Sequence, residues 1–280
     1  MKIYNILFVF ALALFSSCSS DDATTPTVNE LDGLTKFKEI TNDTHTIELY
    51  SPAGFLEQGY NDISLRIKNN STNDYEKEAT IAWMPMMHMT MMTHSCPKSM
   101  VEKVTTEGTL YSGYIVFQMP QNETEYWDLK IDYTIEGTAF TTTSVIDVPA
   151  PAKRKVNSFM GTDNVRYIVA LVEPFEPKVA VNDMTALVFK MENMMSFPAV
   201  NDFTLKIDPR MPSMGNHGSP NNVDLTSSTT DEFYHGKLSL TMTGYWKINL
   251  QLANAADEIL KGEAITETNE ASSLFFEIEF

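Results

Sequence analysis

Cysteine is nearly absent from this chain of 280 residues, which has only two, Cys18 and Cys96. Positive charge is also scarce, because 20 Lys and Arg stand against 37 Asp and Glu and give a formal net charge of -17 at pH 7. Nucleic-acid binding needs a basic face, so this balance argues against a nucleic-acid partner. The acidic residues are dispersed along the chain, which is typical of a soluble surface.

The common signatures of catalytic sites are missing as well. The sequence has no nucleophile elbow, no HExxH motif, no glycine-rich phosphate loop and no clear carboxylate pair. No Ser/His/Asp set is singled out by its spacing. We therefore predict that the protein is not an enzyme.

The start of the chain has the features of a secretory signal. Lys2 supplies a positive charge, Ile6–Phe15 is a short apolar run, and two serines precede Cys18. The apolar run is too short for a membrane-spanning helix, which needs roughly 20 residues. The stretch LFSSC, residues 14–18, resembles the bacterial lipobox, although Phe15 is bulkier than usual. This resemblance implies a signal peptide over residues 1–17 and a lipid on Cys18, which would anchor the protein to a membrane. The alternative is an ordinary signal peptide in which Cys18 has no role.

The residues after Cys18 indicate a cellular location and a flexible tether. The acidic run SSDD, residues 19–22, resembles the surface-export signal of Bacteroidota lipoproteins and favours the outer membrane, on its periplasmic or its surface-exposed face. Residues 18–35 are rich in Thr, Pro and Asp, which predicts a flexible tether. If Cys18 is lipidated, Cys96 has no partner for an intrachain disulfide, and packing alone must hold the domains together.

Two halves of the chain share motifs in the same order. The sequence offset between matched motifs stays between 119 and 123 residues, in the pairs Asn61–Ile63 and Asn182–Met184, His94–Pro97 and His217–Pro220, Tyr111–Gly113 and Tyr234–Gly236, and Tyr126–Trp127 and Tyr245–Trp246. We predict two homologous domains, over residues 36–148 and 165–280, with a linker over residues 149–164.

Short segments rich in β-branched and aromatic residues predict strands in both halves. The segments are 60–67, 113–119, 127–135, 141–148, 238–242 and 246–252. Residues 253–262 are the only candidate for a helix. Many short strands separated by turns are typical of β-sandwiches, so the predicted fold is all-β, with two tandem immunoglobulin-like sandwiches.

Methionine is unusually abundant, with 17 residues in the chain and seven of them between Met84 and Met100. On one continuous strand, side chains alternate between two faces. One face would then carry Met84, Met86, His88, Met92 and His94, and the other Trp83, Pro85, Met87, Met89 and Met91. Thioethers select Cu(I), imidazole suits Cu(I) and Cu(II), and neither is as easily oxidised as a thiolate in an envelope compartment. The first face is therefore a candidate copper site.

Other interpretations of the methionines stay open. Methionine also fills gaps in hydrophobic cores, which is an alternative for this segment and for Met191, Met194 and Met195. A methionine-rich strand can also form an adaptable docking surface for another protein. Cys96 is either a further ligand or a buried thiol.

The second half resembles the YtkA-like or FixH-type domain. The resemblance rests on M-P-x-M-x-x-H at Met211–His217, an aromatic-x-G strand start at Tyr234–Gly236 and M-x-G-x-W at Met242–Trp246. It implies an immunoglobulin-like sandwich similar to the copper carrier CopC, found in envelope proteins linked to copper handling and oxidase assembly. The ligands it implies are Met211, Met214, His217 and Met242 in the second domain, with Met91, His94 and Met119 in the first and His88 opposite Met211. In the first domain the glycine of the last motif is missing and the spacing is longer.

The expected function is that of an envelope lipoprotein that binds copper as a carrier, buffer or assembly factor without catalysis. Its expected partner is an envelope protein of copper handling. The full set of candidate ligands is Met84, Met86, His88, Met91, Met92, His94, Met119, Met211, Met214, His217 and Met242. The alternative is a tandem immunoglobulin-like interaction or structural module without metal.

Overall fold

The computed structural model describes residues 29–227 and 231–280. The predicted signal peptide, Cys18 and most of the predicted tether lie outside the described residues. Residues 31–280 form one compact unit. Its described residues contain no α-helix and only one short 3-10 turn, η1 (Pro212–Met214), among the strands, so the predicted all-β class is confirmed. The described part of the chain offers no helix of the length and hydrophobicity that a membrane crossing needs.

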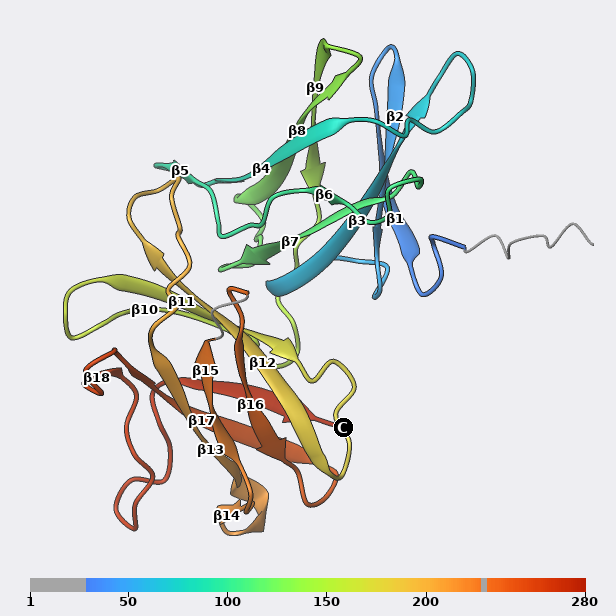
Figure 1. The fold of residues 1–280 in the computed structure, drawn as a ribbon. Helices are drawn as coiled ribbons and strands as arrows, with labels where there is room; N and C mark the ends of the chain where they lie inside the picture. The colour runs from blue at the N-terminus through green and yellow to red at the C-terminus, as the bar shows by residue number, and fades with distance from the viewer. Residues whose placement is uncertain (1–28, 228–230) are drawn as a thin grey trace, which may run out of the picture. The chain divides into compact units, whose positions relative to one another are not determined.

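Two antiparallel sheets build the N-terminal sandwich (Figure 1). One has the order β1-β2-β3-β7-β6, with β1 (Thr35–Thr41), β2 (His45–Ser51), β3 (Gly59–Asn69), β7 (Tyr111–Phe117) and β6 (Glu102–Lys103). The other has the order β5-β4-β8-β9, with β5 (Thr93–His94), β4 (Thr80–His88), β8 (Tyr126–Ile135) and β9 (Thr138–Ile146). Alternate side chains of both sheets meet in one core, where Leu65 and Phe117 of the first sheet pack with Trp127 and Ile131 of the second.

The C-terminal sandwich repeats this plan. Its first sheet contains β10 (Val156–Met160), β11 (Arg166–Glu173), β12 (Val181–Met191) and β16 (Tyr234–Ser239). Its second contains β13 (Thr204–Met211), β14 (His217–Gly218), β17 (Tyr245–Ala253), β18 (Ile259–Lys261) and β19 (Phe275–Glu279). Strand β15 (Val223–Ser227) pairs with β16 on one side and β13 on the other. It therefore joins the two sheets along one edge.

The sequence repeat reappears as equivalent strand registers. Ile63 pairs with Gly113 across β3 and β7, and Met184 pairs with Gly236 across β12 and β16. Both glycines are required by packing, because a Cβ at either position would lie about 2.6 Å or less from a backbone oxygen. Residues that match between the two halves of the sequence thus occupy equivalent positions in paired strands of the two domains.

Two segments differ from their predicted structure. Residues 253–262, the helix candidate, form the end of β17, a turn and β18, with Leu252 paired to Lys261. The left-handed backbone of Asp257 and the side chain of Asn254, which accepts from two backbone N–H groups, make this turn. Strand β10 lies in the segment predicted as a linker and pairs with β11.

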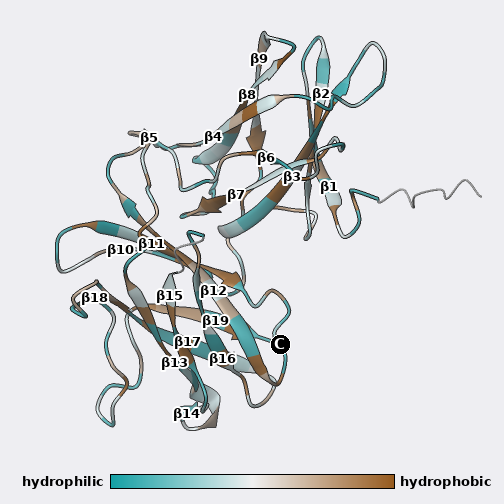
Figure 2. Cartoon of the chain, in the orientation of Figure 1, coloured by the Kyte–Doolittle hydropathy of each residue, from teal (hydrophilic) through white to brown (hydrophobic). Residues whose placement is uncertain are grey.

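A third apolar cluster joins the two sandwiches. Strands β7, β11 and β12 are buried on both faces, so that neighbouring residues of one strand point into different cores. In β11, Tyr167 and Val169 belong to the core of the C-terminal sandwich, whereas Ile168 and Ala170 belong to the third cluster. Figure 2 shows hydrophobic residues along strands of both sandwiches, β7 among them, and hydrophilic residues in many of the loops.

Candidate metal centre

Strand β4 carries the first half of the Met/His segment. Trp83, Pro85 and Met87 are buried, whereas the alternate residues Met84 and Met86 are half-buried. His88 ends the strand, also half-buried. Up to this residue the segment alternates between a core face and an outer face, as predicted.

Beyond His88 the prediction of one continuous strand is wrong. The chain turns back at Met89, whose N–H donates to the carbonyl of Met92 at 3.0 Å, and returns as β5, antiparallel to β4. His94 pairs with Met87 and shares its buried face rather than the face of Met84. The turn leaves Met91 at the hairpin tip with 88% of its surface exposed, and Met92 is exposed as well.

The hairpin brings His94 to Met119, which follows β7. The imidazole Nε2 of His94 lies 3.3 Å from the sulfur of Met119, and its Nδ1 lies 2.7 Å from the backbone oxygen of Ser95. A carbonyl oxygen only accepts, so the contact at 2.7 Å favours a proton on Nδ1, although the amide nitrogen of Gln118 also lies 3.3 Å from Nδ1. In the neutral imidazole with its proton on Nδ1, Nε2 keeps a lone pair. An imidazole nitrogen and a soft thioether sulfur, both of which copper accepts as ligands, therefore face each other.

The surroundings of His94 fix this orientation. Trp127 packs edge-on against the imidazole, with ring centroids 5.6 Å apart, and its indole N–H donates to the carbonyl of Met119 at 3.0 Å. Gln118 donates to the carbonyl of Ser95 at 3.3 Å, and its own side-chain oxygen is buried without a partner among the described residues. The Ser95 carbonyl and Gln118 carry no sequence signal, because their roles depend on where β5 and β7 meet.

The outer face of β4 belongs to a different neighbourhood. The hydroxyl of Ser95 donates to the sulfur of Met84 at 3.5 Å. Nε2 of His88 lies 2.7 Å from a carboxylate oxygen of Asp128, and its ring stacks on Tyr126 with centroids 4.8 Å apart. Met86 is the half-buried residue that pairs with Asp128 across β4 and β8. These contacts occupy one nitrogen of His88, which lies on the half-buried face of β4, whereas His94 shares the buried face of Met87.

The C-terminal domain arranges its candidate ligands differently. Met211 is buried in the core and pairs with His217 across β13 and β14. Since His94 pairs with Met87, the counterpart of Met211 by register is Met87 rather than His88. His217 and Met242 are exposed, and Met214 is 57% exposed. One contact is common to both domains: the indole of Trp246 donates to the carbonyl of Met242 at 3.0 Å, as the indole of Trp127 does to that of Met119. Among its described residues, the C-terminal domain has no buried histidine beside this methionine.

The donor types at the centre limit its chemistry. No group of three His, Cys, Asp or Glu side chains within residues 29–227 and 231–280 could hold a metal ion. Cys96 lies fully buried in the N-terminal core, and burial raises the pKa of its thiol. Because metal ligation needs the thiolate, this environment favours the buried-thiol interpretation of Cys96. The donors that meet at this centre are one imidazole and one thioether, a set suited to Cu(I).

Comparison with known proteins assigns neither a family nor a function. No family model matches the sequence, and no curated protein matches it. A solved structure of FdeC, described as a broadly conserved Escherichia coli adhesin, is similar to 82% of this chain and covers 81% of its own, at 10% identity and a TM-score of 0.23. A similarity this distant carries no argument about fold or function.

Proposed function

We propose that this protein is a copper-binding lipoprotein of the cell envelope, and that it holds Cu(I) at His94 and Met119 as a carrier or buffer without catalysis. The contact of 3.3 Å between Nε2 of His94 and the sulfur of Met119 carries the proposal. The hydrogen bond from Nδ1 to the Ser95 carbonyl supports it, because metal-bound histidines are usually oriented in this way through their second nitrogen. The envelope location rests on the lipobox resemblance at Cys18.

The burial of the pair suits a carrier. His94 is buried, whereas Met119 is half-buried, so the site opens on the side of the thioether. Two protein ligands leave room in the coordination shell of a Cu(I) ion for a ligand from a donor or acceptor protein. A thioether ligates without losing a proton, so no deprotonation is needed at Met119.

A Cu(I) competition titration with bicinchoninate tests the proposal. We expect His94→Gln and Met119→Leu each to weaken Cu(I) binding at least tenfold, since loss of an orienting partner alone costs about 10- to 100-fold. The matched controls are His217→Gln and Met242→Leu, the same changes at the equivalent positions of the C-terminal domain, and we expect them to leave this affinity unchanged. Unaltered uptake in the His94 and Met119 variants, with folding intact, would contradict the proposal.

A second candidate is a docking module, favoured by the exposed thioethers. Met91 and Met92 are exposed at the β4–β5 hairpin, and Met194 and Met195 are exposed in the loop after β12. The N–H of Ser95 donates to the carbonyl of Met194 at 2.8 Å, which joins the two loops. A docking role predicts that Met91→Ser with Met195→Ser abolishes capture of an envelope partner while Cu(I) uptake persists. Capture that survives both changes would speak against it.

A further inference from the structure

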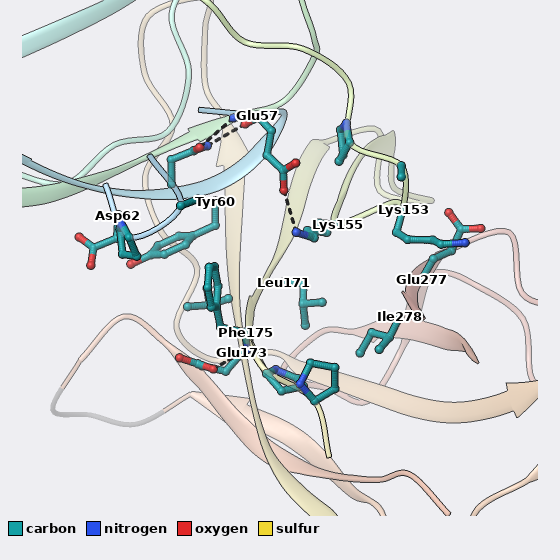
Figure 3. Close-up of a pocket in the computed structure, with 18 of the residues that line it drawn as sticks. Glu57, Tyr60, Asp62, Lys153, Lys155, Leu171, Glu173, Phe175, Glu277 and Ile278 are labelled. Atoms are coloured by element: carbon teal, nitrogen blue, oxygen red, sulfur yellow. Dashed lines mark hydrogen bonds and ion pairs between the residues drawn. The ribbon is translucent and has the colours of Figure 1, made fainter. Parts of the chain in front are cut away.

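A cleft outside the candidate metal centre has the dimensions of a small-molecule site. Its volume is about 590 Å³, within the range of roughly 300–1,000 Å³ that is usual for ligand pockets. The walls come from residues 51–62, from residues 151–155, from the end of β11 with the loop that follows it, and from β19. Figure 3 shows that the lining side chains from these separate segments converge on one space.

One side of the cleft is aromatic. Tyr60 and Phe175 both line the cleft, as do the apolar side chains of Leu171 and Ile278 (Figure 3). Phe175 is 63% exposed, and Phe55, which also lines the cleft, is 53% exposed. Large aromatic rings left open to solvent inside a concave site offer faces on which a ligand can pack.

The two lysines of the cleft already have acidic partners. Nζ of Lys155 lies 2.7 Å from a carboxylate oxygen of Glu57, and Lys153 forms an ion pair with Glu279. Glu277 accepts from the backbone N–H of Arg154 at 2.9 Å and from the hydroxyl of Tyr245 at 2.8 Å. These charged groups are therefore already paired within the protein.

The carboxylates on the aromatic side have no such cation. Asp62 and Glu173 form no salt bridge with any residue in the described ranges, and Glu173 accepts only the N–H of Phe175 within the cleft, at 2.8 Å. Burial raises the pKa of the Tyr60 hydroxyl, and the negative charges of Asp62, Glu173 and Glu232 raise it further. The surrounding protein also desolvates Asp62 and raises its pKa. This corner therefore carries two uncompensated negative charges beside two aromatic faces.

We propose that the cleft binds an organic cation with an apolar body. The ammonium group would lie among Asp62, Glu173 and the faces of Tyr60 and Phe175, where carboxylates and aromatic rings both attract positive charge. The apolar body would pack on Leu171 and Ile278. A neutral or anionic ligand of the same shape binds less well, because it covers the two carboxylates without pairing them. The residues of this site are separate from His94 and Met119, so the inference does not depend on copper.

Calorimetric titration with matched probes tests this inference on the purified protein. The probes are phenethylammonium and benzyltrimethylammonium as cations, 2-phenylethanol as the neutral isostere and phenylacetate as the anion. We expect saturable binding of both cations at one site, and affinities at least about fivefold lower for the neutral and anionic probes, which is what one charge pair contributes even in water. Absence of saturable cation binding, or equal binding of the alcohol, overturns the inference.

Variants locate the binding. Asp62→Asn with Glu173→Gln should weaken cation binding at least about fivefold, and Phe175→Ala should weaken it about two- to fivefold through lost cation–π contact. These are surface positions, and Glu267→Gln, an exposed carboxylate outside the cleft, is the matched control. Cation affinity that is unchanged in the Asp62 and Glu173 variant would place the binding elsewhere and contradict the proposal. Cu(I) uptake should be the same in all of these proteins.

Discussion

Glu48 of β2 is a buried carboxylate held by three donors. It accepts from the hydroxyls of Tyr50 at 2.6 Å and Tyr75 at 2.9 Å, and from Nζ of Lys36 at 3.3 Å. Burial by itself would raise the pKa of Glu48, but these hydrogen bonds outweigh burial and lower it below its ordinary value of 4.5. A carboxylate with a lowered folded-state pKa stabilises the fold above its unfolded-state pKa, and this contribution is lost as the pH falls through the folded-state pKa.

We predict that Glu48→Gln lowers the free energy of unfolding by about 1 kcal/mol or more at pH 7, because hydrogen bonds to a charged group exceed those to a neutral one. The difference from the unaltered protein should stay constant at neutral pH and shrink below about pH 4. Urea unfolding at a series of pH values measures it, with Glu39→Gln on the exposed neighbouring strand as control. A difference that is independent of pH down to pH 3 would show that the charge of Glu48 is not what stabilises the fold.

At the scale of single elements, each sandwich has a strand that begins with a tyrosine, and the hydroxyl of this tyrosine forms hydrogen bonds with the backbone of a loop. The hydroxyl of Tyr111, at the start of β7, donates to the carbonyl of Lys77 at 2.6 Å and accepts the N–H of Ala79 at 2.8 Å. Tyr234, at the start of β16, makes the same pair of contacts with the carbonyl of Val200 at 2.7 Å and the N–H of Phe203 at 3.2 Å. The motif that revealed the repeat in the sequence is thus a structural tie in both domains.

We predict that Tyr111→Phe and Tyr234→Phe each lower the free energy of unfolding by about 1–3 kcal/mol, because each leaves a partly buried backbone donor and acceptor without a partner. Tyr126→Phe, on an exposed ring, should change it by less than about 0.5 kcal/mol. Chemical denaturation measures all three variants. If only one of the two variants lowers the free energy of unfolding, the tyrosines occupy equivalent positions but do not stabilise their domains equally.

At the scale of the whole molecule, the third apolar cluster couples the two sandwiches. Ile168 and Val169 are fully buried neighbours on β11, but Ile168 faces the shared cluster and Val169 faces the core of the C-terminal sandwich. Tyr114 and Val116 of β7 enter the shared cluster from the N-terminal sandwich. Burial of this surface should make the two sandwiches unfold together.

We predict one thermal transition for the unaltered protein and two for Ile168→Ala, with roughly 2–5 kcal/mol of lost stability. Val169→Ala, one residue away on the opposite face, should lower the stability and keep a single transition. Differential scanning calorimetry distinguishes the two variants. Two transitions in the unaltered protein would refute the coupling.

The sequence pattern of the Met/His segment predicts its first strand and not the turn that follows. The alternation along β4 is visible in the sequence because side chains of any strand alternate with a period of two. The turn at Met89–Met92 is not visible, because it contains no glycine, proline, asparagine or aspartate to mark it. The alternation alone predicts a single continuous strand, and such a strand would carry His94 on the face of Met84 rather than on that of Met87.

The strands that enter the third apolar cluster can be recognised in the sequence by uninterrupted apolar runs. The consecutive apolar residues Ile168–Leu171 and Ala186–Phe189 do not alternate with polar ones, which is typical of strands covered on both faces. Such a run indicates that something covers the outer face. It does not identify the partner surface, which here is Tyr114 and Val116 of the other sandwich.

The sequence by itself determined the all-β class, the tandem repeat and the types of donor atom available, because period, propensity and motif order are local properties of the chain. Only the tertiary structure decided that His94 meets Met119, that His217 stays exposed, and that Asp62 and Glu173 share a cleft with Tyr60 and Phe175. Each of these depends on contacts between segments far apart in the chain. Cysteine, scarce in the sequence, takes no part in either proposed site, and the two lysines of the cleft are paired with carboxylates. Thioether, imidazole, carboxylate and aromatic groups provide the chemistry.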